Sequence, residues 1–106
     1  MPMSEYDQRQ YKLMLERLIT FERGAVPLDR LVIDLEGLLN TLEVVEHSWR
    51  QTFRHYWGTL ETGRAVASEG TTNFSAEAIR VLGDAAAHLK LMVLEKIDDP
   101  ADNAQA

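Results

Sequence analysis

Three histidines are the side chains of this 106-residue sequence best suited to acid–base or metal chemistry. His47 follows Glu43 by four residues, a spacing at which two side chains on one helix face could reach the same cation. A zinc site needs more ligands than this pair supplies, and His55 and His88 are interpreted as ordinary residues of helix surfaces. The sequence therefore predicts neither a bound metal nor a cofactor.

Motifs for covalent or phosphate chemistry are also missing. The chain has no cysteine, which excludes thiol nucleophiles and cysteine-based metal sites. It lacks the G-x-S-x-G elbow, the P-loop and the G-x-G-x-x-G fingerprint. Carboxylate pairs carry no information, because 17 acidic residues make accidental pairs unavoidable. We therefore expect a protein that is not an enzyme.

Charge and hydropathy narrow the classes of partner. The formal net charge is -6 at pH 7, which argues against nucleic acid as a partner and is compatible with a basic protein. No apolar run approaches the ~18 residues of a membrane span. The N-terminal M-P-M-S-E-Y-D lacks the basic and apolar regions of a signal peptide. These features predict a cytoplasmic protein without a membrane partner.

Four stretches have the apolar spacing of amphipathic helices, and helix-starting or helix-stopping residues separate them. The expected helices are Ser4–Arg23, Pro27–Val45, Ser48–Ala67 and Ser75–Ile97. Ser48 followed by Gln51 has the spacing of a capping box, and E-G-T-T-N (69–73) is the expected loop before the last helix. Short connections predict an all-α fold, an antiparallel four-helix bundle. We expect one domain over residues 4–97 and a polar, disordered tail over 98–106.

Aromatic residues recur every four positions in the third expected helix. Trp49, Phe53 and Trp57 could form a platform for a ligand. They also keep helical period with Leu60, and large rings supply much of the buried area of a small core. We therefore expect these side chains to face the core. The expected inner face of the fourth helix comprises Ile79, Leu82, Ala86, Leu89, Val93 and Ile97.

One flank of the second expected helix carries acids every seven residues. Apolar side chains lie beside these acids, on the side opposite the leucine stripe. Apolar residues rimmed by acids are a candidate docking patch for a basic protein. The hypothesised partner-binding residues are Asp29, Ile33, Glu36, Asn40, Glu43 and Val44. In the competing interpretation, the acids pair internally with Arg50 and Arg54.

Two segments resemble a family of small bacterial proteins. They are L-D-R-L-V-I-D-L-E-G-L-L-N-T-L (Leu28–Leu42) and W-R-Q-T-F-R-H-Y-W-G-T-L-E (Trp49–Glu61), about half of the chain. The specific element is W-x-x-x-F-x-x-x-W-x-x-L-E, and some members resemble immunity proteins encoded beside contact-dependent or other polymorphic toxins. The chain departs from the pattern at Gly63 and Arg64.

The resemblance implies a protein that binds and neutralises a cognate toxin domain, and it carries over no catalytic residue. A basic nuclease domain is one partner that an acidic helical surface could block. The alternative is a helical regulatory or antitoxin-like subunit that acts through homo-oligomerisation, and a homodimer suits a core this small. An enzyme or small-ligand carrier would need a pocket with convergent polar groups among the aromatic residues.

Overall fold

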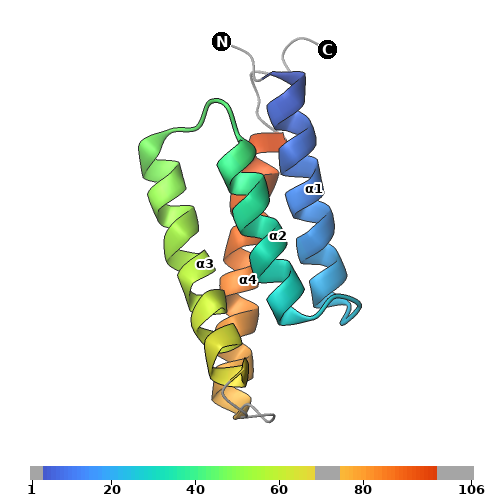
Figure 1. The fold of residues 1–106 in the computed structure, drawn as a ribbon, viewed down its shortest axis with the longest axis vertical. Coiled ribbons are helices and arrows are strands. Elements are labelled where there is room, and N and C mark those ends of the chain that lie inside the picture. Colours follow the sequence, from blue (N-terminus) through green and yellow to red (C-terminus); the bar gives the residue numbers. More distant parts are fainter. Residues whose placement is uncertain (1–3, 69–74, 98–106) are drawn as a thin grey trace.

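The computed structural model describes residues 4–68 and 75–97, which form four helices and no strand (Figure 1). The helices are α1 (Glu5–Glu22), α2 (Leu28–Thr41), α3 (His47–Ser68) and α4 (Ala76–Ile97). The all-α prediction is confirmed for this part of the chain. The predicted loop at 69–73 and the predicted tail at 98–106 lie outside the described residues.

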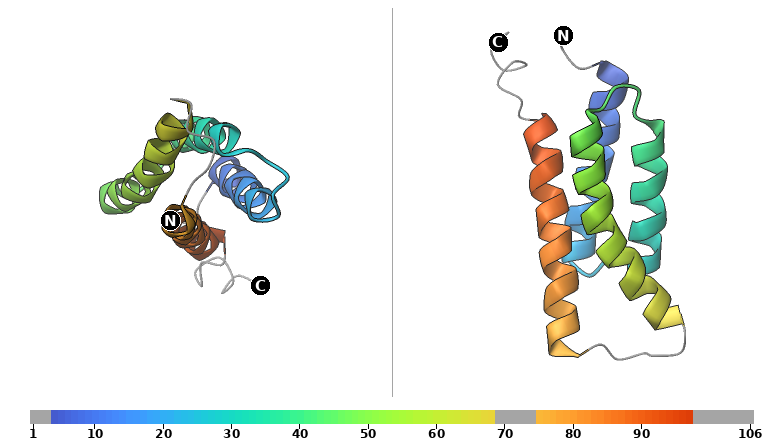
Figure 2. Two further views of the ribbon diagram at one scale, coloured as in Figure 1. Left: turned by 90° about the horizontal axis from the view of Figure 1, so that it is seen from below. Right: turned by 90° about the vertical axis from the view of Figure 1, so that its left-hand side faces the viewer.

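The helices pack around one core. Among the described residues, α1 and α3 each pack along both α2 and α4, whereas α1 and α3 lie diagonally opposite one another, as do α2 and α4 (Figure 2). The four helices therefore stand at the corners of a ring. At 22 residues each, α3 and α4 are longer than α2 with 14, and their joined ends extend beyond α1 and α2 (Figure 1).

Local sequence signals set three of the helix ends as expected. The Ser4 hydroxyl accepts the Asp7 N–H at 3.1 Å and caps α1. Gly24 follows the end of α1 with a φ of 77°, a backbone conformation that suits glycine at this position. The Ser75 hydroxyl accepts the Ala78 N–H at 3.1 Å and caps α4.

The predicted start of α3 is wrong by one residue. The helix begins at His47, and the Arg50 N–H donates to the Glu46 carbonyl at 3.0 Å. Ser48 consequently lies inside the first turn, and the capping box with Gln51 is not the start of this helix. The predicted end of α2 at Val45 is also wrong, because α2 ends at Thr41.

The aromatic stripe of α3 lies against the core, but Trp57 is less deeply buried than the other members. Phe53 and Leu60 are fully buried and Trp49 is 9% exposed, whereas Trp57 is half-buried at the edge of the core. The Trp57 indole N–H donates to the Val32 carbonyl of α2 at 3.0 Å. The other buried apolar residues are Tyr11, Met14, Leu18, Leu31, Val32, Leu35, Leu39, Leu42, Ala85, Ala86, Leu89 and Val93.

One member of the predicted inner face of α4 is exposed. Ile79 is 59% exposed, although Ala86, Leu89 and Val93 of the same predicted face are buried. The first turns of α4 lie past the ends of α1 and α2, so these helices do not cover them (Figure 1). The apolar period of α4 therefore continues beyond the part of the helix that the core can bury.

Replacement of Phe53 with Ala should lower the free energy of unfolding by about 3–5 kcal/mol, because it removes a fully buried ring from the centre of the core. Urea unfolding followed by far-UV circular dichroism measures this change. Ile79→Ala is the control, since Ile79 is 59% exposed and its truncation should change stability far less. Equal losses in the two variants would contradict the burial of Phe53 at the centre of the core.

Candidate partner-binding surface

A buried carboxylate of α1 holds the connection between α2 and α3, residues 42–46. Asp7 is 1% exposed. Its Oδ1 accepts the Glu43 N–H at 2.8 Å and its Oδ2 accepts the Val44 N–H at 3.0 Å. A carboxylate taken out of water needs such donors, and charge-assisted hydrogen bonds are stronger than neutral ones. The backbone of the loop is therefore fixed to the first turn of α1.

These contacts explain why α2 stops before Val45. In a longer helix, the N–H groups of Glu43 and Val44 would donate to carbonyls four residues earlier. Asp7 accepts both N–H groups instead, and the Leu42 N–H closes a tighter turn on the Leu39 carbonyl at 3.3 Å. Glu43 and Val44 consequently belong to a loop, so the acids spaced by seven residues do not follow one helix flank.

The fixed loop presents an apolar side chain to solvent. Val44 is 80% exposed, more than any other large hydrophobic side chain in the described part of the chain. Exposed Glu43 precedes it, and exposed Glu46 lies two residues further on. The Ser4 hydroxyl donates to the Glu43 carboxylate at 3.4 Å. The loop thus offers one apolar contact between two carboxylates on a backbone that is already ordered.

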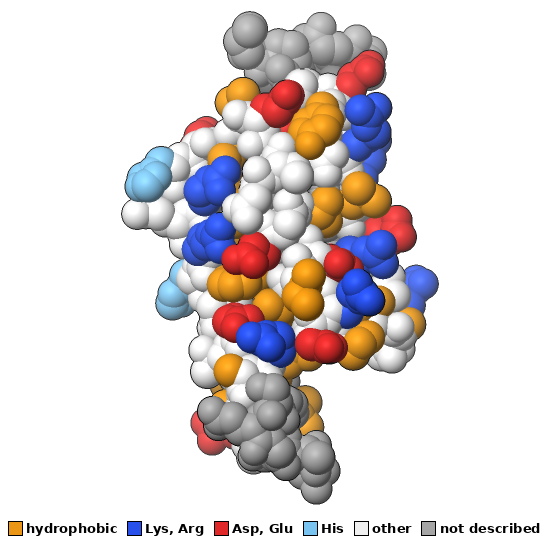
Figure 3. Space-filling view, viewed as in Figure 1, with side chains coloured by type: hydrophobic (Ala, Val, Ile, Leu, Met, Phe, Trp, Pro, Cys, Tyr) orange, Lys and Arg blue, Asp and Glu red, His pale blue; other side chains and the backbone are white. Residues whose placement is uncertain are grey.

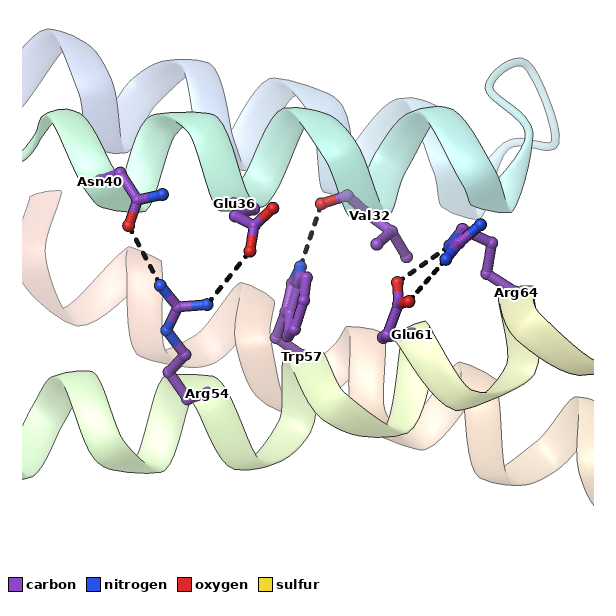
Figure 4. A network of polar contacts seen from close by, with 7 residues as sticks. All are labelled: Val32, Glu36, Asn40, Arg54, Trp57, Glu61 and Arg64. Carbon is purple, nitrogen blue, oxygen red and sulfur yellow. Dashed lines mark hydrogen bonds and ion pairs between the residues drawn. The ribbon is translucent and has the colours of Figure 1, made fainter.

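Two more of the hypothesised residues face α3 and are partnered there (Figure 4). One Arg54 nitrogen lies 3.4 Å from the Glu36 carboxylate, and another donates to the Asn40 side-chain oxygen at 3.0 Å. The Arg54 guanidinium also lies 5.4 Å from the centroid of the Trp57 ring. The interpretation of internal pairing therefore holds for Glu36 with Arg54. The acidic side chain of Glu43 instead contacts Ser4.

The contacts of Glu36, Asn40 and Val32 with Arg54 and Trp57 form a polar seam between α2 and α3. A second ion pair lies nearer the end of α3. Arg64 donates two hydrogen bonds to the Glu61 carboxylate, at 2.9 and 2.6 Å (Figure 4). These bonds lower the pKa of Glu61 below its ordinary value. Both side chains lie on α3, three residues apart, so the pair stabilises the helix surface and does not join two helices.

The remaining two hypothesised residues lie apart from the loop. Asp29 is exposed in the first turn of α2. Ile33 is 60% exposed and lines a hollow between α1 and α2, beside an ion pair of 3.5 Å between Arg17 and Asp34. The structure therefore brings Glu43 and Val44 together, sets Glu36 and Asn40 against Arg54, and leaves Asp29 and Ile33 separate.

Charge on the face around α2 is mixed. Figure 3 shows basic and acidic side chains next to one another over α1 and α2, with hydrophobic side chains between them. Surface ion pairs such as Arg17–Asp34 and Arg54–Glu36 cancel much of the charge that the acids of α2 would otherwise present. The carboxylates of Glu43 and Glu46 beside Val44 therefore present more negative charge to a partner than the paired acids Asp34 and Glu36 do.

The structure does not form the pair of Glu43 and His47 that the spacing suggested. Glu43 lies in the loop and His47 begins α3, so they do not share a helix face as the spacing suggested. His88 stacks on Tyr56 with ring centroids 4.6 Å apart, and its Nδ1 lies 2.8 Å from the Asp84 carbonyl. Within residues 4–68 and 75–97, no three His, Asp or Glu side chains gather as metal ligands would. That no metal is required stays a prediction.

Sequence reasoning missed the burial of Asp7, and it named Arg54 only in the interpretation that the acids of the second helix pair internally. In the sequence, Asp7 is recognisable only as an acid in the first turn of α1. A signal for burial was present, because Asp7 keeps helical register with Tyr11, Met14 and Leu18, all of which are buried. The contacts of Arg54 with α2 had no local signal beyond its charge, because they depend on how α3 lies against α2.

No described helix is long and apolar enough to cross a membrane. Comparison of the chain with protein-family models, curated proteins and solved structures finds no match.

Replacement of Asp7 with Ala should destabilise the protein by about 1–3 kcal/mol for each of the two loop N–H groups left without an acceptor. Thermal and urea unfolding measure the loss. Asp34→Asn is the matched control, because Asp34 forms only a surface ion pair worth about 0–1 kcal/mol. Unfolding midpoints that agree between the Asp7 and Asp34 variants would show that the loop does not depend on Asp7.

Stability should also fall at alkaline pH through Tyr11. Burial, with a further contribution from the nearby Asp7 charge, raises the pKa of Tyr11 from 10.0 to about 12. The folded state thus retains the phenol proton that the unfolded chain loses, so this contribution is complete below pH 10.0 and disappears as the pH rises towards about 12. Urea unfolding across this range should show a steeper decline for the wild type than for Tyr11→Phe. Parallel curves would contradict the assignment.

Proposed function

We propose that this chain is a non-enzymatic protein-binding module, an immunity protein that binds and neutralises a cognate bacterial toxin domain. The observation that carries the proposal is the exposed Val44 on a loop whose backbone is held by Asp7. The loop N–H groups satisfy the buried Asp7 carboxylate, so the backbone that carries the exposed Val44 is held in place before any partner binds. A preordered contact loses little conformational entropy when a partner binds.

The partner should match the chemistry of the loop. An apolar pocket would receive Val44, and basic side chains around it would meet Glu43 and Glu46. Asn40 and Glu36 continue the polar surface one and two turns back along α2, and Asp29 adds a separate acid at the start of the helix. The net charge of -6 would draw a basic partner, such as a nuclease domain, into encounter.

We also propose that the four helices form an antiparallel bundle and that the protein acts in the cytoplasm. The ring of helix contacts and the short connections support an antiparallel four-helix bundle. A protein that neutralises an incoming toxin acts in the cytoplasm of the cell that makes it. Neither a cofactor nor nucleic acid has a role in this function, because the interaction is between two protein surfaces.

The direct test is protection from a toxin domain encoded by a gene adjacent to that of this chain. Cells expressing the toxin domain should grow only when they also make this protein, and the two purified proteins should form a complex. Val44→Asp should remove both protection and the complex, while the fold is retained by circular dichroism. Full protection by Val44→Asp would separate toxin neutralisation from the loop, and no binding by the wild type would refute the function.

Reversal of the loop charge gives a quantitative prediction. In the double variant Glu43→Lys with Glu46→Lys, which changes the two exposed acids beside Val44, association with the toxin domain should slow by about tenfold at low salt and lose most of its salt dependence. Stopped-flow mixing at several salt concentrations measures the rate. Glu36 is left unchanged, because a lysine there would face Arg54 and disturb the seam between α2 and α3.

The control carries the same change of net charge on another side of the molecule. Asp84→Lys with Glu95→Lys alters two exposed acids of α4, the helix that lies diagonally opposite α2 (Figure 2). Steering by the local surface predicts a much smaller effect for this control. Equal slowing in both double variants would instead assign the attraction to the net charge of the whole protein.

A further inference from the structure

The outward face of α2 borders a shallow apolar hollow that the loop contacts do not use. It has a volume of about 440 Å³ and is lined by Leu13, Arg17, Ile33, Asp34, Gly37, Leu38 and Thr41. Polar contacts between α1 and α2 close both ends. Arg17 lies 3.5 Å from Asp34 at one end, and the Thr41 hydroxyl donates to the Gln10 side-chain oxygen at 3.4 Å at the other.

Gly37 lies in this hollow, although the packing of the chain itself does not require a glycine there. A Cβ built on Gly37 would meet no atom within 4 Å, so the packing of the chain leaves room for alanine or a larger residue. Glycine in the middle of a helix is less favourable than alanine. Gly63 differs in this respect, because a Cβ there would lie 2.7 Å from the Leu82 side chain. The space over Gly37 is thus unfilled within the molecule.

The ridge that contains Gly37 also carries a large exposed side chain. Ile33, Gly37 and Thr41 are spaced by four residues and form one ridge on the helix surface. Ile33 is 60% exposed, and Leu13 of α1 is 40% exposed across the hollow. A protruding isoleucine therefore lies one turn from a gap that could receive an isoleucine. Two copies of this face could therefore each supply the side chain that the gap of the other would receive.

We propose that a second copy of this chain binds here, with the α2 helices crossing about a two-fold axis on their outward faces. This axis passes through the outward ridge between Ile33 and Gly37 and places Ile33 of each copy over Gly37 of the other, so both insertions form at once, as an isologous interface requires. Ridges of residues spaced by four interdigitate in the commonest class of helix crossing, and glycine allows the two backbones to approach closely. Leu13 and Leu38 would line the side of the inserted isoleucine.

The charges of this face favour a second copy over a strongly basic partner. Asp34 and Glu36 lie on either side of the ridge, and each is paired with an arginine of its own molecule. A basic protein would gain little from acids that are already paired, whereas two copies would not bring two unpaired acids together at the ridge. The net charge of -6 on each copy still opposes association over longer distances. Added salt should therefore strengthen this dimer.

The interface should be weak and reversible. A stable interface usually buries about 800 Å² on each partner, and one 14-residue helix with the adjoining edge of α1 offers less. We expect a dissociation constant on the order of micromolar to hundreds of micromolar. Sedimentation of the full chain over this concentration range should show a weight-average mass that rises from one chain towards two.

Two single variants test the geometry. Ile33→Ala and Gly37→Ala should each raise the dissociation constant by about tenfold or more, the first by removing the inserted side chain and the second by filling its gap. Gly37→Ala should also raise the melting temperature of the monomer, because alanine favours the helix. Greater stability with weaker association distinguishes loss of the interface from loss of the fold.

Two control variants match these closely. Ile79 on α4 is 59% exposed, nearly the same as Ile33, and Ile79→Ala should leave the dissociation constant unchanged. A Cβ added to Gly58 on α3 would also meet no atom within 4 Å, and Gly58→Ala should stabilise the monomer without affecting the dimer. A chain that stays monomeric at about 1 mM overturns the proposal. So does a dimer that is indifferent to Ile33→Ala and Gly37→Ala, or one weakened equally by the controls.

This proposal stands apart from toxin neutralisation. The dimer uses the outward ridge of α2 and the adjoining edge of α1, whereas toxin binding uses the loop and the polar side of α2, and the dimer is predicted to strengthen rather than weaken with salt. Val44→Asp should leave the dimer intact, and Ile33→Ala should leave protection from the toxin domain intact. The absence of a dimer would therefore leave toxin neutralisation open, and the absence of toxin binding would leave the dimer open.

Discussion

A carboxylate inside an apolar core must find hydrogen-bond donors, and Asp7 finds them 36 and 37 residues away in the α2–α3 loop. This requirement links α1 to the junction of α2 and α3. It ends α2 at Thr41, because the next free N–H groups are taken, and it sets where α3 can begin. It also leaves Val44 pointing to solvent on an ordered backbone. The surface proposed for toxin binding thus depends on a residue that such a partner would not touch.

The second helix has a different role on each of its sides. Its inner side places Leu31, Leu35 and Leu39 in the core. The side towards α3 is polar and joined by Arg54 and the Trp57 indole, whereas the outward side carries Ile33 and the gap over Gly37. Because the acids beside this gap are paired within the molecule, the face is suited to shape recognition. The loop, with its exposed carboxylates, is suited to electrostatic recognition.

The spacing of apolar residues predicted the four helices because this spacing can be read within each segment, without knowledge of its neighbours. Phe53, Leu60 and Leu89 were placed correctly for this reason. Predictions failed where a distant contact decides, as at the end of α2, or where no helix lies opposite, as at Ile79. The candidate site was predicted as one acidic flank, but Glu36 faces Arg54, Ile33 lines a hollow and Val44 lies in a loop. A residue spacing cannot reveal which neighbouring helix will supply a partner.

The two tryptophans of α3 occupy different surroundings, and this has an optical consequence. Trp49 is 9% exposed, packs edge-on to Tyr11 of α1 and stacks on Phe53, and its indole N–H has no hydrogen-bond partner among the described residues. Trp57 is half-buried, and its N–H is bonded to the Val32 carbonyl of α2. Since water relaxes around an excited indole only where it has access, Trp49 should emit at shorter wavelength than Trp57. Fluorescence therefore distinguishes separation of α3 from α1 at one end from separation of α3 from α2 along the seam.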